Sequence, residues 1–165
     1  MRRPLGIAVI LSLPLAAHPV RAELAPLPPE LESLADVVMA NRPPAEVARA
    51  DAAAEEAIGA IPDETSRTLH DAQRLFLLGF DAIGRGNTST GEAYVEQSME
   101  AARDSLAEHE SSEGYRILAD GYNQLLKVRG RAYQMFHFRS ARDTADRAVE
   151  LDRRNPLAHV SAASY

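Results

Sequence analysis

The chain has 165 residues, of which 18 are basic and 24 acidic, so its formal net charge at pH 7 is −6. An acidic chain is unsuited to nucleic acid, whose phosphates are bound by clustered lysine and arginine, and we expect no nucleic-acid partner. No cysteine is present, which excludes disulfide bonds, thiolate metal sites and a lipid-modified N-terminal cysteine. The fold must therefore be held together by packing, and the length suits one domain.

The first segment, residues 1–22, has the three parts of a secretory signal peptide. Met1-Arg2-Arg3 is charged, residues 5–17 are apolar, and Val20-Arg21-Ala22 has the small-x-small form of a cleavage site. The apolar stretch contains Pro14 and is shorter than the roughly 20 residues of a membrane span. We expect cleavage near Ala22, a periplasmic or secreted protein, and no integral membrane span in the mature chain. The segment holds three arginines and no acidic residue, so the mature chain has 15 basic and 24 acidic residues and a net charge of −9.

The second segment, residues 23–62, is predicted to form a proline-containing leader followed by two capping helices. The leader should be extended because proline fixes φ and donates no backbone hydrogen bond. Helical periodicity predicts one helix over residues 30–40 and another over 45–60, with Pro44 suited to the first turn of the second. The apolar positions of these helices are Leu31, Leu34, Val37, Val38, Val47, Ala50, Ala54, Ala57 and Ile58.

The third segment, residues 63–165, begins with two longer predicted helices. Asp63 is suited to cap a helix that runs to Gly84, and a fourth helix is predicted over residues 89–108. The third helix is apolar around more than half its circumference, so it should be covered on two sides. We expect the two N-terminal helices to cover its Phe76, Phe80 and Ile83. The buried residues of the fourth helix should be Val95, Met99, Ala102 and Leu106.

The last two long helices are predicted with different clarity. Ser111 or Ser112 can cap a fifth helix that buries Leu118, Ala119 and neighbouring apolar residues. A sixth helix is predicted over residues 140–152. Residues 129–138 between them are ambiguous, since they could prolong the fifth helix or form a turn and a short aromatic plug. Strand-length alternation of apolar and polar residues does not occur, so the sequence predicts an all-helical fold.

Several motifs in residues 66–165 repeat along these helices. Leu78-Gly79 in the third helix corresponds to Leu118-Ala119 followed by Tyr122 in the fifth. Ala141, Ala145 and Ala148 form a small-residue seam, and Asn155-Pro156 opens another helix after Glu150-Leu151-Asp152. This stretch resembles the tetratricopeptide repeat family, although Arg153 stands where the family has proline. The resemblance implies an α-solenoid of stacked antiparallel helical hairpins.

The resemblance also implies a binding site, because in this family the first helix of each hairpin lines a concave groove that binds a protein or peptide. Alignment on Leu118-Ala119 places a polar stripe of the fifth helix in that groove. Its residues are Glu113, Arg116, Asp120, Asn123 and Gln124. The alternative is a solvated helix face, since Glu113, Arg116 and Asp120 also form ion pairs at helical spacing.

The sequence contains no constellation typical of an enzyme. It has no nucleophile elbow, no Ser/His/Asp order and no phosphate-binding glycine loop, so we predict that the protein is not an enzyme. The histidines outside the signal segment are scattered without the pairing of a zinc site, and we expect no metal and no cofactor. Those histidines are His70, His109, His137 and His159.

Three functional hypotheses remain. The first is an exported scaffold or adaptor that mediates protein–protein interaction in the bacterial cell envelope. The second is a periplasmic small-molecule-binding component of a transport system, with Tyr133, Phe136 and Phe138 lining its pocket. The third is a structural module, the N-terminal part of a longer repeat protein. This third hypothesis arises because residues 155–165 begin a helix whose apolar side (Leu157, Val160 and Ala163) has no second helix to cover it. The same uncovered side would also allow self-association through this segment.

Overall fold

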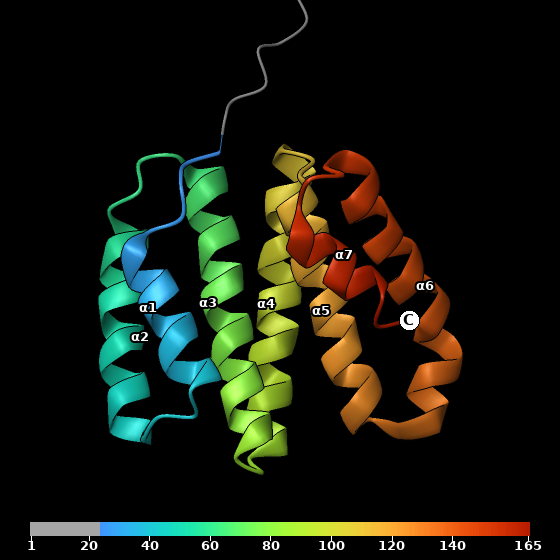
Figure 1. Ribbon diagram of the computed structural model, residues 1–165, viewed down its shortest axis with the longest axis horizontal. Coiled ribbons are helices and arrows are strands. Elements are labelled where there is room, and N and C mark those ends of the chain that lie inside the picture. The colour runs from blue at the N-terminus through green and yellow to red at the C-terminus, as the bar shows by residue number, and fades with distance from the viewer. Residues whose placement is uncertain (1–23) are drawn as a thin grey trace, which may run out of the picture.

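The computed structural model describes residues 24–165, and the predicted signal segment 1–22 lies outside them. Seven helices and no strand occur in this part of the chain, which confirms the prediction of an all-helical fold (Figure 1). The helices are α1 (Pro29–Met39), α2 (Pro44–Gly59), α3 (Glu64–Gly84), α4 (Thr88–Glu108), α5 (Ser112–Val128), α6 (Gly130–Leu151) and α7 (Pro156–Ala162). None of these helices is long and apolar enough to cross a membrane.

Helices that follow one another in the chain pack side by side. α1 packs against α2, α3 against α4, and α5 against α6, and the short α7 packs against both α5 and α6. In Figure 1, α2 stands at one end of the molecule and α6 at the other, with α3, α4 and α5 between them. The described N-terminal segment runs beside the first turns of α3 before α1 begins.

Local sequence signals explain where the helices begin. The side chain of Asp63 accepts a hydrogen bond from the backbone N–H of Ser66, and that of Ser111 accepts one from Gly114, so both predicted caps are confirmed. Asn155 caps α7 in the same way. Pro29, Pro44 and Pro156 each stand in the first turn of a helix, where the missing N–H of proline costs no hydrogen bond.

The segment 129–138 takes neither of the two forms expected from the sequence. It belongs to α6, which begins at Gly130, ten residues before the predicted start at Ser140. Gly130 has a φ of 74°, a conformation that glycine adopts without steric cost, and this residue ends the path of α5 and starts that of α6. The aromatic plug is therefore the first part of a longer helix.

The central contact of the molecule is a close crossing of α3 and α4 at two glycines. A Cβ atom added to Gly79 would lie 2.7 Å from the side chain of Val95 and 2.9 Å from the carbonyl oxygen of Gly91. A Cβ atom on Gly91 would lie 2.8 Å from the carbonyl oxygen of Gly79. Small residues at both positions are therefore what lets the two backbones approach each other.

Two apolar clusters fill the described part of the molecule. The first joins α3, α4 and α5 through Leu69, Ala72, Val95, Met99, Ala102, Ile117, Leu118 and Leu125. The second joins α1 and α2 to α3 through Leu31, Leu34, Val38, Val47, Ala54, Ile58 and Leu77. Phe80 packs against the second cluster and Phe76 is buried, whereas Ile83 packs against the first cluster beside Gly91 of α4, so the expectation that α1 and α2 cover Ile83 was wrong. The broad apolar circumference of α3 is thus covered on both sides.

Candidate functional site

The polar residues predicted to line a groove form a buried ion-pair network on α5. Arg116 is only 6% exposed. Its guanidinium donates from Nε and Nη2 to the carboxylate of Glu113 and from Nη1 to that of Asp120. The three residues are one helical turn apart, so they meet on the same face of α5.

Burial and pairing change the proton affinities of this network. Burial favours the neutral form of Glu113, but Arg116 outweighs it and holds the pKa of this carboxyl below its ordinary value. The pKa of Asp120 is raised, because burial there outweighs the attraction of the same guanidinium. Despite its burial, the two carboxylates raise the pKa of Arg116. The network therefore holds a permanently charged arginine between two carboxylates of unequal acidity.

The segment after α6 covers this network. Ser161 of α7 donates a hydrogen bond to Asp120 over 2.5 Å, and the hydroxyl of Tyr165 donates to the backbone carbonyl of Ala119. At the other end of α7, the side-chain amide of Asn155 donates to Ser112 over 3.2 Å. The polar stripe of α5 is consequently an internal contact between α5 and α7, rather than an open polar surface.

The other two predicted site residues lie beside the same contact. Gln124 is buried, and Asn123 is half-buried. Asn123 lines a small depression of about 250 Å³ together with Phe138 of α6 and Tyr165. The structure therefore brings Glu113, Arg116 and Asp120 into direct contact. Whether any of the five residues binds a partner remains a prediction.

Exposed apolar side chains gather on the last two helices. Among the described residues, six large apolar side chains are exposed, and all but Met39 belong to α6 or α7. We call these five residues the C-terminal apolar surface: Met135, Phe136, Phe138, Leu157 and Val160. The exposed fractions of Met135 and Phe136 are 83% and 80%, and those of Leu157 and Val160 are 52% and 65%.

Met135 was not among the residues expected to have a role, although the sequence contains a signal for it. Met135 and Phe136 lie between Arg131 and Arg139, on the side of α6 opposite the buried seam of Ala141, Ala145 and Ala148. Bulky apolar residues between arginines on the outer side of a helix are a signal that periodicity analysis can find once the helix is known to start at Gly130.

The aromatic residues of the small-molecule hypothesis do not line one pocket. Tyr133 lies beside a depression of about 460 Å³ formed with Glu96, Met99, Glu100, Arg103 and Leu125. Phe138 contacts Tyr165 edge to face at the separate depression described above. Phe136 is exposed and lines neither of them. Neither of these depressions is therefore shared by the three aromatic residues.

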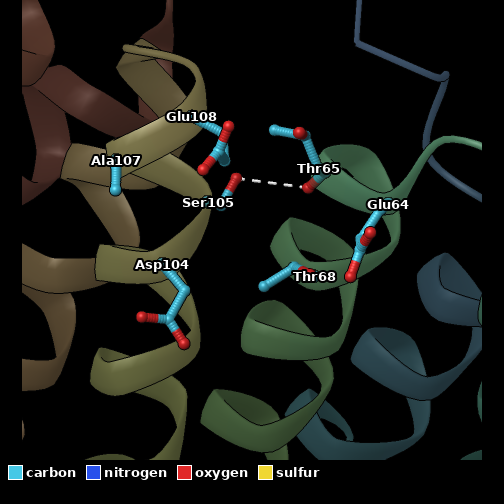
Figure 2. A pocket seen from close by; sticks show the side chains of 7 residues that line it. All are labelled: Glu64, Thr65, Thr68, Asp104, Ser105, Ala107 and Glu108. Atoms are coloured by element: carbon cyan, nitrogen blue, oxygen red, sulfur yellow. Dashed lines mark hydrogen bonds between the residues drawn. The ribbon is translucent and has the colours of Figure 1, made fainter.

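A third depression, of about 560 Å³, lies between the start of α3 and the end of α4 (Figure 2). Ser105 spans it by donating to the backbone carbonyl of Thr65 over 3.2 Å. Glu64, Asp104 and Glu108 stand at separate places around it in Figure 2 and do not converge on one point. No group of three metal-ligating side chains is assembled anywhere in residues 24–165.

The chain was compared with protein-family models, curated proteins and solved structures. No family model, no curated protein and no solved structure matches it. The function is therefore inferred from the geometry of the chain's own residues. Among the described residues, the large apolar side chains that are exposed lie mainly on α6 and α7, and we take these positions as candidate contacts for another molecule.

Proposed function

We propose that this protein is an exported, tetratricopeptide-like scaffold that binds a partner protein in the bacterial cell envelope. The pairing of neighbouring helices and the glycine crossing of α3 and α4 support the stacked-hairpin part of this proposal. The layout of residues 1–22 supports export. The observation that carries the binding function is the C-terminal apolar surface on α6 and α7.

The chemistry of this surface points to an acidic amphipathic helix as the bound element. Leu157 and Val160 lie three residues apart, so they stand on one side of α7, as the apolar anchors of a helix-to-helix contact do. Four of the seven arginines in residues 129–154 form ion pairs, and the other three, Arg131, Arg153 and Arg154, are exposed without an ion pair in residues 24–165. A helix with an apolar side and acidic flanks matches both features.

Site-specific photo-cross-linking tests this proposal. A photoreactive amino acid replaces Phe136 in the full chain produced in its native host, and a matched chain carries it at Ala53, an exposed position on α2 at the opposite end of the molecule. We expect a discrete adduct with another protein from position 136 and none from position 53. Adducts of equal yield from both positions, or none from either, would contradict the proposal.

A second copy of this chain is the alternative occupant of the same surface. Its adduct would have twice the mass of the chain, and sedimentation of the purified protein would show a concentration-dependent dimer. That result would mean that this surface binds a second copy of the chain, through residues 155–165 and α6, and not a different protein.

A further inference from the structure

The extended segment before α1 is bonded to α3 through its backbone. The N–H of Ala25 donates to the hydroxyl of Ser66 over 2.8 Å, and the carbonyl oxygen of Ala25 lies 3.0 Å from Nε2 of His70. Ser66 and His70 are four residues apart, so they stand on the same face of α3. Both bonds are made to the main chain of Ala25 and neither depends on its side chain.

The carbonyl of Ala25 determines which ring nitrogen of His70 carries the hydrogen. A carbonyl oxygen only accepts hydrogen bonds, so Nε2 of His70 must carry the hydrogen. In the neutral ring, Nδ1 is then an acceptor, and it is buried without a hydrogen-bond partner in the described part of the chain. His70 is 5% exposed and Ser66 is fully buried. Two buried polar side chains of α3 are thus directed at one residue outside the helix.

Apolar contacts anchor the segment on either side of Ala25. Leu24 packs against the cluster that contains Leu69 and Ile117, and Leu27 packs against the cluster that contains Leu31. Pro26, Pro28 and Pro29 restrict the backbone between and after these anchors. A segment held extended in this way loses little conformational entropy on docking.

We propose that Ser66 and His70 form a main-chain clamp for an extended peptide, and that the chain's own residues 24–27 are its resident occupant. The clamp accepts a segment with two apolar residues three positions apart and a small residue directly after the first. An extended partner segment with this pattern takes the clamp when the resident segment leaves. This clamp lies on α3, away from the C-terminal apolar surface, so either proposal can fail while the other stands.

The covalent connection to α1 explains why the resident segment stays bound at the clamp. A segment joined to α1 by a single proline has an effective concentration in the millimolar range or above, which a dilute free peptide cannot match. Weakening the resident segment should therefore expose the clamp to a free peptide. Residues 24 and 25 lie outside all helices, so substitutions there change no helical residue.

Fluorescence anisotropy with a labelled peptide of residues 24–29 tests the clamp. The peptide is titrated into the full chain and into its Leu24→Ser, Ala25→Pro double variant, with circular dichroism confirming equal helix content. A control peptide carries proline at the position of Ala25 and so lacks the N–H that Ser66 accepts. We expect the double variant to bind the first peptide at least about tenfold more tightly than the wild-type chain does, and to bind the control peptide only weakly. Equal affinity of wild type and variant, or equal affinity for the two peptides, overturns the proposal.

Hydrogen exchange in the wild-type chain supplies a second measurement that needs no substitution. Excess peptide of residues 24–29 should raise the exchange rate of the Ala25 amide by displacing its hydrogen bond to Ser66. The proline-bearing control peptide should leave the rate unchanged. If neither peptide changes the hydrogen-exchange rate of the Ala25 amide at millimolar concentration, a free peptide does not displace the resident segment. That result would contradict the proposal.

Discussion

Asp120 of α5 accepts a hydrogen bond from Ser161 of α7 over 2.5 Å, although the two residues are 41 positions apart in the chain. This contact joins the short α7 to the ion pairs of Arg116. Ser161→Ala should remove the bond and leave Asp120 with one partner fewer, at a cost of about 1 kcal/mol. We expect faster hydrogen exchange of the α7 amides in this variant.

Ser164 provides a matched control for that substitution, because its exposed hydroxyl donates only to the carbonyl of Val160 in its own turn. Ser164→Ala should leave exchange in α7 within experimental error of the wild type. Equal exchange rates in the two variants would show that the contact between Ser161 and Asp120 does not hold α7 in place.

Arg116 is the member of the network whose loss should cost most. Arg116→Met leaves Glu113 and Asp120 partly buried without their cation, and breaking such a pair costs about 3–5 kcal/mol. Arg147 pairs with Glu110 at an exposed position and serves as the control, because Arg147→Met should cost far less stability than Arg116→Met. Urea unfolding of both variants measures the difference, and similar losses of stability would argue against a special role for Arg116.

The two carboxylates of the network should affect acid stability in opposite directions. The pKa of Glu113 is lowered from its ordinary value of 4.5, so its stabilising effect is complete at neutral pH and is lost as the pH falls below 4.5 through the lowered pKa. The pKa of Asp120 is raised from 3.8, so the ionised carboxylate lowers the free energy of unfolding at neutral pH. This unfavourable contribution disappears as the pH falls through the raised pKa towards 3.8.

Glu113→Gln should therefore flatten the fall in the free energy of unfolding between about pH 5 and pH 3, whereas Asp120→Asn should steepen it. Urea denaturation at closely spaced pH values measures both slopes, with the wild type as reference. If the two variants changed the slope in the same direction, the opposite pKa shifts described here would be refuted.

The glycine crossing of α3 and α4 gives a packing prediction. A methyl group on Gly91 would meet the side chain of Ile83 and the backbone of Gly79, so Gly91→Ala should destabilise the protein by about 1–3 kcal/mol. Gly84 ends α3 with open space around it, and Gly84→Ala should be neutral or stabilising by up to about 1 kcal/mol. Thermal unfolding measures the melting temperature of each variant. The two shifts from the wild-type melting temperature should have opposite signs or differ clearly in size.

The helices and their caps were predictable because the signals lie within a few residues of one another. Asp63 and Ser111 carry oxygen acceptors directly before amphipathic stretches, and the structure uses both as caps. The start of α6 was not predictable in this way. The bulky residues at positions 135, 136 and 138 indicate a buried plug, and only the left-handed conformation of Gly130 shows that a new helix has already begun.

The burial of the predicted polar stripe also lay beyond local sequence analysis. An arginine with carboxylates three residues before it and four residues after it has the same pattern on an exposed helix and on a covered one. The difference is made by Ser161 and Tyr165, more than 40 residues away, which lie against α5. Such long-range coverage is set by the tertiary fold.

If the C-terminal apolar surface binds a partner protein, that partner should co-purify with the chain from the cell envelope. A tagged wild-type chain is compared with a Phe136→Ser, Val160→Ser variant and with a control variant, Glu55→Ser, Glu56→Ser, altered at exposed positions of α2. We predict that one partner co-purifies in a fixed ratio with the wild type and the control, and is lost from the apolar-surface variant. Equal recovery of that partner with all three chains, or no partner with any of them, would contradict the account.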